Sequence, residues 1–383
     1  MQKNNNILFI PLGGGQRVGA SCYFLRLGET NILLDAGTGT NGGIICNPVF
    51  SSLMSLPGFC SMNQIDHIFI SHAHIDHCGY LFNIMSEASQ ANVYMTDITK
   101  SLMELQIYDR KLSGKDIHSQ QLRLSAQNKL DKITTVSFMK SMHFERFNVT
   151  FYPAGHIPGA MMILFEFNGK NILYTGDYSI DSSPLTQGCI IPDKKIDTLI
   201  LCGLHAKHPN YTKRSDTVFS MIKNAFGKVR KGASVQISVS QLSKGIELLQ
   251  MINQSNSDHI PVYIGPKVMQ VVEKMEKNGI GIISPENRQM LDVPPSFPHI
   301  YITESPRANP IYYSEKIDVD FTLHEDFSQM TKFISTIDPK QVIIVHTAKA
   351  NDPNDMTIEQ KIMLDSDCKA QFTFAEEQEI YKL

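Results

Sequence analysis

The chain has 383 residues, with 35 Lys and Arg against 38 Asp and Glu, so its formal net charge is −3. Hydrophobic residues make up 42% of the chain, which is enough to bury a core and excludes a disordered protein. The mildly acidic balance excludes binding of polyanions by bulk charge, although it leaves room for a local basic face. The 13 histidines are more than a passive scaffold needs.

The sequence predicts a cytoplasmic protein without a membrane span. The polar start Met1–Asn6 does not resemble a signal peptide, and no apolar stretch approaches the ~20 residues that cross a bilayer. The seven cysteines are widely spread and form no CxxC pair, which favours a reducing compartment over a disulfide framework.

The first ~200 residues read as short apolar strands separated by glycine turns, with helical stretches between them. The stretch from Thr99 to Leu112 has helical periodicity. The predicted strands are Ile7–Pro11, Cys22–Leu27, Asn31–Asp35, His67–Ser71, Asn92–Thr96, Asn148–Tyr152, Met162–Phe167, Asn171–Thr175 and Thr198–Leu201.

After Cys202 the pattern changes to strands that alternate with helices, which is typical of a parallel sheet. The pattern then returns to one helix, Phe327–Ile337, and one strand, Gln341–Val345, so we expect one domain interrupted by another. The alternating elements are the helix Thr212–Val229, the strand Ser234–Val239, the helix Ser243–Asn253, the strand Val262–Gly265 and the helix Val268–Lys277.

The strongest chemical signal is the motif His72-Ala-His74-Ile-Asp76-His77, which directly follows a predicted strand. Burying three imidazoles and a carboxylate together is costly unless they bind a metal or pair with one another. His72 and His74 alternate along an extended segment and therefore point the same way, whereas Asp76 and His77 turn toward a second position. The motif predicts a metal site.

Three further ligand-type residues lie at the ends of other predicted strands. His156 lies in a loop bracketed by glycines, Asp177 follows Thr175-Gly176, and His346 ends the strand Gln341–Val345. Each signal is weak alone, since an Asp at a strand end is often a cap or turn residue. Together with the first motif they supply the imidazole and carboxylate ligands expected of a two-zinc site.

This ligand set resembles that of the metallo-β-lactamase superfamily, and further motifs resemble its β-CASP nucleases. The closest resemblance is to the endonuclease subunit of the cleavage and polyadenylation specificity factor and its prokaryotic relatives. The additional matching segments are Pro11–Gln16 with Val18–Ala20, Leu33–Gly37, Ala154–His156 with Gly159–Ala160, Asp320–Phe327 and Val345–His346.

The resemblance implies an α/β fold, an αβ/βα sandwich interrupted by a small β-CASP domain with a parallel sheet. The expected boundaries are 1–205 and 325–383 for the lactamase domain and 206–324 for the insert. The resemblance also implies two Zn²⁺ ions, with Asp35 as an acid that orients a ligand histidine or simply as a turn residue. His72, His74 and His156 would hold one ion, Asp76, His77 and His346 the other, and Asp177 both.

The resemblance further implies hydrolysis of RNA phosphodiester bonds, since the RNA-cleaving branch carries a histidine at the position of His346. The partner would be RNA, most simply single-stranded. A homodimer is a further candidate assembly. His324 matches the histidine that would protonate the leaving oxygen, with a surface loop residue as the alternative. Asp326, two positions later, is first of all a helix cap. Asp76, Asp177 and His324 are therefore the expected catalytic residues.

The sequence departs from the family pattern where substrate is handled. Cys202 replaces an acid that would orient His324; His205 is a candidate substitute, although a plain loop histidine is the simpler interpretation. Arg17 replaces a glutamate after the glycine-rich loop, Thr347-Ala348 replaces Gly-Glu, and the glycine-rich loop before His324 is reduced to Glu304–Pro310.

The remaining candidates have two interpretations each. The basic run from Lys207 to Lys231 is either a solvated helix face or a track for an RNA backbone. Tyr178 is either packed beneath its loop or stacked on a base. Cys78 is a small core residue rather than a ligand. Two rival functions stay open, a catalytically weak nucleic-acid-binding or assembly subunit and a dinuclear-zinc hydrolase of another ester.

Overall fold

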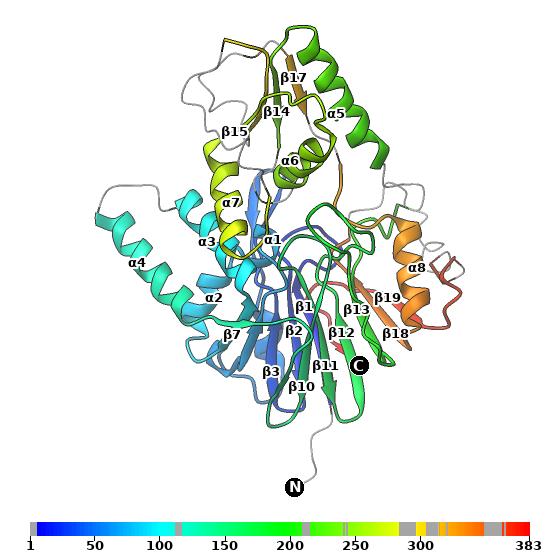
Figure 1. Ribbon diagram of the computed structural model, residues 1–383. Coiled ribbons are helices and arrows are strands. Elements are labelled where there is room, and N and C mark those ends of the chain that lie inside the picture. The colour runs from blue at the N-terminus through cyan, green and yellow to red at the C-terminus, as the bar shows by residue number, and fades with distance from the viewer. Residues whose placement is uncertain are drawn as a thin grey trace. The chain divides into compact units, whose positions relative to one another are not determined.

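The computed structural model divides the chain into two compact units (Figure 1). Unit 1 comprises 1–181, 188–212 and 324–383, and unit 2 comprises 182–187 and 213–323. Lys213, Arg214, the segment Glu304–Pro310, Asp320 and Ala348 lie outside the described residues. The structure describes residues 6–111, 117–208, 215–239, 242, 244–282, 296–303, 313, 315–318, 321–347, 362–363 and 365–383.

Two seven-stranded sheets form the frame of unit 1. The first has the order β20-β1-β2-β3-β6-β7-β8 and the second β19-β18-β13-β12-β11-β10-β9. Each sheet has an antiparallel and a parallel portion. Their strands are β1 (Ile7–Gly13), β2 (Cys22–Leu27), β3 (Thr30–Leu34), β6 (His67–Phe69), β7 (Asn92–Thr96), β8 (Thr134–Val136), β9 (Ser141–His143), β10 (Asn148–Pro153), β11 (Met161–Phe167), β12 (Lys170–Tyr174), β13 (Thr198–Cys202), β18 (Gln341–Val345), β19 (Gln371–Phe374) and β20 (Tyr381–Lys382).

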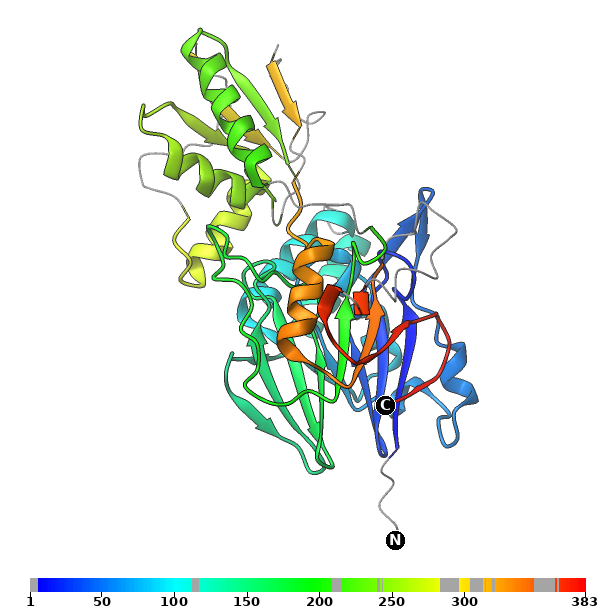
Figure 2. The ribbon, with the colours of Figure 1, turned by 90° about the vertical axis from the view of Figure 1, so that its right-hand side faces the viewer.

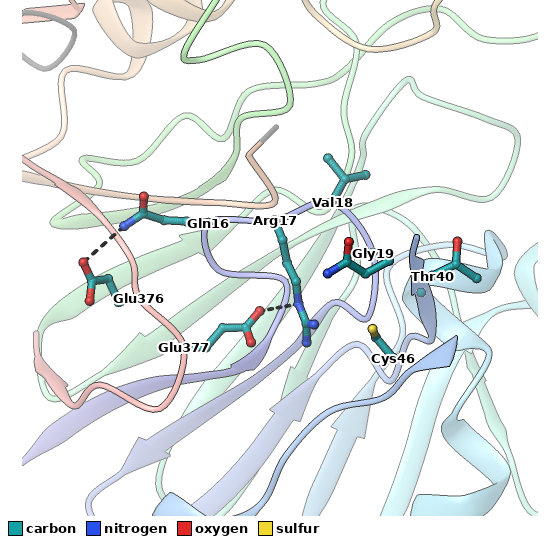
Figure 3. A pocket seen from close by; sticks show the side chains of 10 residues that line it. Gln16, Arg17, Val18, Gly19, Thr40, Cys46, Glu376 and Glu377 are labelled. Carbon is teal, nitrogen blue, oxygen red and sulfur yellow. Dashed lines mark hydrogen bonds and ion pairs between the residues drawn. The ribbon is translucent and has the colours of Figure 1, made fainter. Parts of the chain in front are cut away.

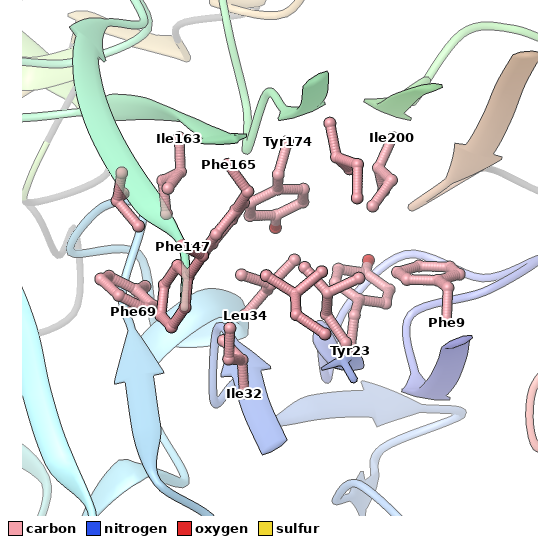
Figure 4. Packing of buried hydrophobic residues seen from close by; sticks show 14 of the residues in the cluster. Phe9, Tyr23, Ile32, Leu34, Phe69, Phe147, Ile163, Phe165, Tyr174 and Ile200 are labelled. Atoms are coloured by element: carbon pink, nitrogen blue, oxygen red, sulfur yellow. The ribbon is translucent and has the colours of Figure 1, made fainter. Parts of the chain in front are cut away.

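The main core lies between the two sheets, as Figure 4 shows. Alternate residues of each strand point into it, because successive side chains in a strand face opposite sides. Phe9, Tyr23 and Phe69 come from the first sheet and pack against Phe165 and Tyr174 from the second. All five side chains are fully buried. These large rings pack at centroid distances such as 5.5 Å for Phe69 and Phe165.

Helices cover the outer faces of both sheets (Figures 1 and 2). On the first sheet, the opposite side chains of the same strands, such as Phe24 and Ile68, pack with Leu81, Met103 and Leu130 of the covering helices. Helix α8 lies against the second sheet, where Met330 approaches the backbone of Gly203. The elements concerned are η1 (Ser51–Ser55), η2 (Met62–Gln64), α1 (Ile75–Cys78), α2 (Leu81–Glu87), α3 (Asp97–Lys111), α4 (Ile117–Asp131) and α8 (Phe327–Ile337).

This helix–sheet–sheet–helix arrangement confirms the predicted αβ/βα sandwich. A small hairpin of β4 (Gly39–Asn41) and β5 (Ile44–Cys46) projects from it. No helix in the described parts of the chain is both long and apolar enough to cross a membrane.

Unit 2 is built on a four-stranded sheet in the order β15-β16-β14-β17, in which every pair is parallel. The parallel sheet expected from the alternating pattern is therefore present. Its elements are α5 (Ser215–Arg230), β14 (Val235–Ser238), α6 (Lys244–Ser255), β15 (Val262–Ile264), α7 (Pro266–Lys277), β16 (Ile300–Thr303) and β17 (Glu315–Asp318). Assignment of unit 2 to the β-CASP domain, with the boundaries given above, stays a prediction.

Candidate metal centre

The ligand-type residues of unit 1 gather where strands of both sheets end. Strands β6, β12 and β18 lead directly into the segments that carry His72, Asp177 and His346, and the β10–β11 connection carries His156. Because parallel strands place their carboxyl ends at one edge of a sheet, residues far apart in sequence meet there. This edge is where an open α/β sheet usually binds its ligands.

The first group contains His72, His74, His156 and Asp177, whose ligand atoms all lie within 4.8 Å of one another. Nε2 of His72 is 3.1 Å from Nδ1 of His74, and Nε2 of His156 is 3.2 Å from the same atom. Three nitrogens held around a zinc ion at 2.0–2.1 Å in tetrahedral geometry would lie about 3.3 Å apart, so the observed spacing fits that ion.

The second group contains Asp76, His77 and His346, which likewise lie within 4.8 Å of one another. His77 is in the short helix α1, and its ring centroid is 5.0 Å from that of His346. Nε2 of His346 is 3.8 Å from Oδ2 of Asp76. The structure thus separates the histidine motif into two pairs, as the sequence predicted, because the chain turns into α1 after His74.

Asp177 lies between the two groups. Its Oδ2 atom is 3.7 Å from Nε2 of His72, 3.7 Å from Nε2 of His156 and 3.4 Å from Nε2 of His77. All three distances are longer than the usual N···O distance of a hydrogen bond, so these atoms surround a common space without bonding to one another. A carboxylate in this position can serve both groups.

Several of these buried atoms have no hydrogen-bond partner in the structure. They are Nε2 of His77, Nε2 of His346 and both carboxylate oxygens of Asp177. Leaving a buried polar atom unsatisfied costs about 1–3 kcal/mol, and more when the group is charged. An ion bound among them would satisfy all four, and imidazole with carboxylate is a donor set that zinc accepts. The residues present therefore fit a pair of zinc ions.

Electrostatics within the two groups reflects their dense burial. Burial lowers the pKa of His72 well below its usual value, and the neighbouring histidines add to this effect. Burial also disfavours a charged His77, but Asp177 and Asp35 outweigh it and raise the pKa of His77 well above its usual value. A metal ion would displace that proton, since only neutral imidazole is a ligand.

Asp177 shows the complementary behaviour. Burial alone would raise the pKa of its carboxyl group, but the charges of His77, His346 and His324 hold that pKa well below its usual range. The carboxylate is therefore ionised over the whole physiological pH range, which is the state that a metal ligand requires.

Asp35 organises the base of the site. Its Oδ2 atom is 2.7 Å from Nδ1 of His77 and accepts hydrogen bonds from the Ser71 hydroxyl and from Tyr174, while its Oδ1 atom accepts one from the backbone N–H of Ser71. The fully buried Asp35 adopts a left-handed backbone with φ of 60°. Of the two interpretations offered by the sequence, the structure supports the acid that orients a ligand histidine.

Two serines orient other ligand histidines. The hydroxyl of Ser71 is 3.0 Å from Nδ1 of His72, and that of Ser21 is 2.8 Å from Nδ1 of His346. In each case the second ring nitrogen is directed into the site. Sequence reasoning missed Ser21, Ser71 and Tyr174, because a serine or tyrosine in an apolar strand region carries no signal of its own.

Gly37 is required by a close backbone approach at the site. A Cβ atom at this position would lie 1.7 Å from the carbonyl oxygen of Asp76. That same carbonyl accepts a hydrogen bond from the backbone N–H of Ser21. The glycine of the Leu33–Gly37 motif therefore lets the β3 segment pack directly beneath α1.

His324 joins the site from the segment before α8. Its Nδ1 atom is 3.6 Å from Oδ2 of Asp177, and its ring centroid is 4.7 Å from that of His156. The side chain keeps 25% exposure, so it lies beside the ligands and in contact with solvent. Burial is the main cause that lowers the pKa of His324 well below its usual value, against the opposing charge of Asp177.

The residues after His324 support the loop and the helix that follow it. Asp326 is the N-cap of α8, and its side chain accepts a hydrogen bond from the backbone N–H of Gln329, as the sequence predicted. Glu325 accepts one from the backbone N–H of Ile180. These contacts fix the segment that carries His324 against the Asp177 loop.

Several weaker candidates have structural roles. Tyr178 is 2% exposed and packs on Phe333 at a centroid distance of 4.4 Å, so the suggestion that it stacks on a base was wrong. Cys78 is a buried core residue, as expected. Cys202 lies beneath the site, with its sulfur 3.9 Å from the Tyr174 hydroxyl. Burial lowers the pKa of His205 to about 4, which is typical of a packed loop histidine.

The basic run is partly neutralised within unit 2. Lys228 forms an ion pair with Glu315, and Arg230 forms one with Asp258. These pairs favour the solvated helix face over a continuous track for a polyanion. Lys207 belongs to unit 1 instead, where its ammonium group lies 4.9 Å from the centre of the Phe374 ring.

Residues 15–189 match the model of the metallo-β-lactamase superfamily. Among curated relatives, the endoribonuclease ysh1 of Emericella nidulans is 28% identical over 278 residues, which cover 68% of this chain and 30% of that protein. The cleavage and polyadenylation specificity factor 73 of Drosophila melanogaster is 29% identical over 304 residues, which cover 76% of this chain and 43% of that protein. This chain therefore spans less than half the length of either relative.

One solved structure shares the fold over nearly the whole chain. A crystal structure of a protein of unknown function from Enterococcus faecalis V583 has a TM-score of 0.64 at 12% identity, covering 99% of this chain and 100% of that one. Together, the family match and the curated relatives confirm the resemblance to the metallo-β-lactamase superfamily and its β-CASP nucleases that the motifs indicated.

Proposed function

Because this chain carries a metallo-β-lactamase domain, we propose that it is a zinc-dependent ribonuclease that hydrolyses RNA phosphodiester bonds. The observation that carries the proposal is the convergence of seven ligand residues around buried, unpartnered atoms of His77, His346 and Asp177. The names of the curated relatives, which are endoribonucleases and a cleavage factor, support RNA as the substrate.

The two ligand groups would hold one zinc ion each. His72, His74 and His156 would bind the first, Asp76, His77 and His346 would bind the second, and Asp177 would bind both. When bound, a zinc pair supplies a Lewis acid that lowers the pKa of water toward neutrality and offsets the charge of the phosphate. Asp35, Ser71 and Ser21 then keep the ligand histidines in the tautomer that presents a free ring nitrogen.

His324 would supply the proton for the departing 3′-oxygen. A phosphodiester leaving group is a poor alkoxide unless it is protonated, and imidazole is the side chain suited to that task near neutral pH. The low pKa of His324 in the free protein would rise when a negatively charged phosphodiester binds beside it, because a nearby anion favours the charged imidazolium. Asp177, at 3.6 Å from Nδ1, favours it as well.

The decisive experiment measures zinc content and cleavage of end-labelled single-stranded RNA and DNA by the purified protein. We expect two zinc ions and RNA cleavage that Asp76→Ala lowers by about a thousandfold, corresponding to several kcal/mol of transition-state stabilisation. Asp193→Ala, which changes an exposed aspartate, is the matched control and should leave both quantities unchanged. Bound zinc without cleavage of either nucleic acid would favour an assembly subunit or a hydrolase of another ester.

A second variant tests the proton donor alone. His324→Ala should lower RNA cleavage by about a hundredfold or more, as loss of a general acid typically does, while zinc content stays the same. His143→Ala, at an exposed histidine outside the site, is its control. An unchanged cleavage rate in His324→Ala would remove this role from His324. A cytoplasmic location and a homodimer stay predictions.

A further inference from the structure

A pocket of about 580 Å³ that contains several charged and amide side chains lies in unit 1 beside the second ligand group (Figure 3). The loop after β1, the β4–β5 hairpin and the segment after β19 each contribute to its walls. Its volume is within the range of about 300–1,000 Å³ that is typical of sites for small ligands. The lining residues are Gln16, Arg17, Val18, Gly19, Gly39, Thr40, Asn41, Cys46, Glu376 and Glu377.

Arg17 is held in this pocket by one edge of its guanidinium group. Its Nε atom forms an ion pair with Oε1 of Glu377 at 2.5 Å, and that oxygen accepts a hydrogen bond from the backbone N–H of Gly15. Figure 3 shows the guanidinium between Glu377 on one side and Cys46 on the other. The two terminal nitrogens of Arg17 and Oε2 of Glu377 form no hydrogen bond with another protein group among the described residues, and the Arg17–Glu377 ion pair holds both side chains in place.

Gln16 and Glu376 fix the neighbouring wall. The side chain of Gln16 donates to Oε1 of Glu376 and accepts a hydrogen bond from Lys207. The loop is therefore anchored on both sides of Arg17. The pocket therefore presents the two terminal nitrogens of Arg17 as donors next to the Glu377 carboxylate as an acceptor. This arrangement selects a ligand by its hydrogen-bonding groups as well as by its charge.

The pocket adjoins the ligand group of Asp76, His77 and His346. A Cβ atom on Gly19, in the pocket wall, would lie 4.0 Å from Cβ of Asp76. The same loop accepts a hydrogen bond from the backbone N–H of His346 at the carbonyl of Gly14. Among the pocket-lining residues none belongs to the His324 segment, so the pocket flanks the site on the side of the second group.

We propose that this pocket binds a guanine base of the RNA strand, next to the phosphate that is cleaved. The proposal rests on the proposed function and adds a sequence preference to it. The terminal nitrogens of Arg17 match the O6 and N7 acceptors of guanine, which is the pairing that arginine makes most often with a base. The carboxylates of Glu377 and Glu376 can accept from the N1–H and amino donors on the neighbouring edge of that base.

The charges of the pocket argue against a phosphate as the occupant. Glu376 and Glu377 line the pocket together with Arg17, and Lys207 bonds to the adjacent Gln16, so the nearby formal charges balance and a dianion would lose its hydration without net electrostatic attraction. A neutral base with both donors and acceptors meets no such cost, and adenine offers an amino donor where guanine offers an acceptor. Single-stranded RNA is commonly read through such splayed bases.

The first test measures binding of guanosine, adenosine and inorganic phosphate to the full zinc-loaded chain by isothermal titration calorimetry. Nucleosides carry no phosphate, so they lack the group that the metal centre is proposed to bind. We expect guanosine to bind about 5- to 150-fold more tightly than adenosine, the discrimination that one bidentate base contact supplies. Guanosine binding that phosphate displaces, or equal affinity for both nucleosides, would overturn the proposal.

Variants separate a base-reading arginine from a simple positive charge. Arg17→Lys keeps the charge but loses the planar pair of donors, so it should abolish the preference for guanosine. Glu377→Gln should reduce guanosine affinity because it removes the carboxylate acceptor. Arg146→Lys is the matched control, since Arg146 also forms an exposed ion pair, with Glu29 at 2.9 Å, and lies outside the pocket.

Cleavage of RNAs that contain one guanine at successive positions provides the second readout. We expect a preferred distance between guanine and the cut in the natural chain, and loss of that preference in Arg17→Lys. RNA cleavage without any guanine preference would overturn this inference and leave the nuclease function intact. Guanosine binding without RNA cleavage would instead contradict the nuclease function and leave the guanine pocket standing.

Discussion

Two buried histidines, one in each unit, are equally shielded from solvent but differ in their hydrogen bonds. His299 of unit 2 and His346 of unit 1 are each 1% exposed. Both ring nitrogens of His299 have partners, with Nε2 2.7 Å from the Tyr313 hydroxyl and Nδ1 2.8 Å from the carbonyl of Phe297. His346 has only Ser21 on Nδ1, and its Nε2 has no hydrogen-bond partner.

The comparison separates structural histidines from ligand histidines. Burial alone marks neither kind, because a satisfied histidine can be part of a core. The ring of His299 packs against Tyr263 and Tyr313, and its two nitrogens bond to the Tyr313 hydroxyl and the Phe297 carbonyl. In unit 1 the unsatisfied atoms of several residues converge on one place, and that convergence is what a metal ion explains.

Among the variants that test this comparison, Asp35→Asn should have the largest effect, which is on zinc affinity. The variant weakens the hydrogen bond that orients His77, so zinc affinity should fall by about 10- to 100-fold, as for other groups that support metal ligands. Competition with a chromogenic chelator measures it. Asp66→Asn is the control, because Asp66 also accepts a backbone N–H in the first sheet, that of Asn31, but touches no ligand. Equal zinc affinity in both variants would contradict the role of Asp35.

The corresponding change in unit 2 should affect stability and leave zinc alone. His299→Phe removes the partner of the buried Tyr313 hydroxyl, so we expect a loss of about 1–3 kcal/mol in the free energy of unfolding. Urea denaturation followed by circular dichroism measures it, with zinc content determined in parallel. Less bound zinc in His299→Phe, or an unchanged free energy of unfolding, would contradict the assignment of a structural role to His299 and a metal-binding role to His346.

The smallest effect is expected where a single unpartnered atom stands apart from the ligand groups. The buried Tyr178 hydroxyl has no hydrogen-bond partner, so Tyr178→Phe relieves the cost of an unsatisfied polar atom and should raise the free energy of unfolding by about 1 kcal/mol. Tyr174→Phe is the matched comparison, because it removes the donor to Asp35 and should cost about 1.5–3 kcal/mol. Thermal unfolding of the two variants, measured under the same conditions, shows whether the contribution of a buried tyrosine hydroxyl to stability depends on its hydrogen-bond partner or on its burial alone.

The sequence predicted the frame of the fold well where apolar periodicity is strong. Helix Phe327–Ile337 and strand Gln341–Val345 have the predicted bounds. The strand Glu315–Asp318 was missed, since it is charged and owes its place to pairing with β14. The hairpin of β4 and β5 was missed because its two short strands expose Ile44 and Ile45 and show no core-facing alternation.

The residues of the site fall into two classes. Some could be identified from their residue type in the sequence, and others only from contacts in the three-dimensional structure. Histidines and aspartates at strand ends are informative by their type, so all seven proposed ligands could be named from sequence. Tyr174 reaches Asp35 across 139 positions, and Ser21 reaches His346 across 325, which no local pattern encodes. Arg17 stood out as a departure from the family, but its pocket depends on the distant Glu377.

The pairing of β20 with β1 has a consequence for how the protein is made. Residues 381 and 382 pair with residues 9 and 8, so the outer edge of the first strand stays open until residues 381 and 382 are synthesised. At 5–20 residues per second that interval is about 20 to 75 s. An open strand edge is a template for wrong pairing during this time. The first sheet therefore reaches its full strand order only after the ribosome has passed residue 382.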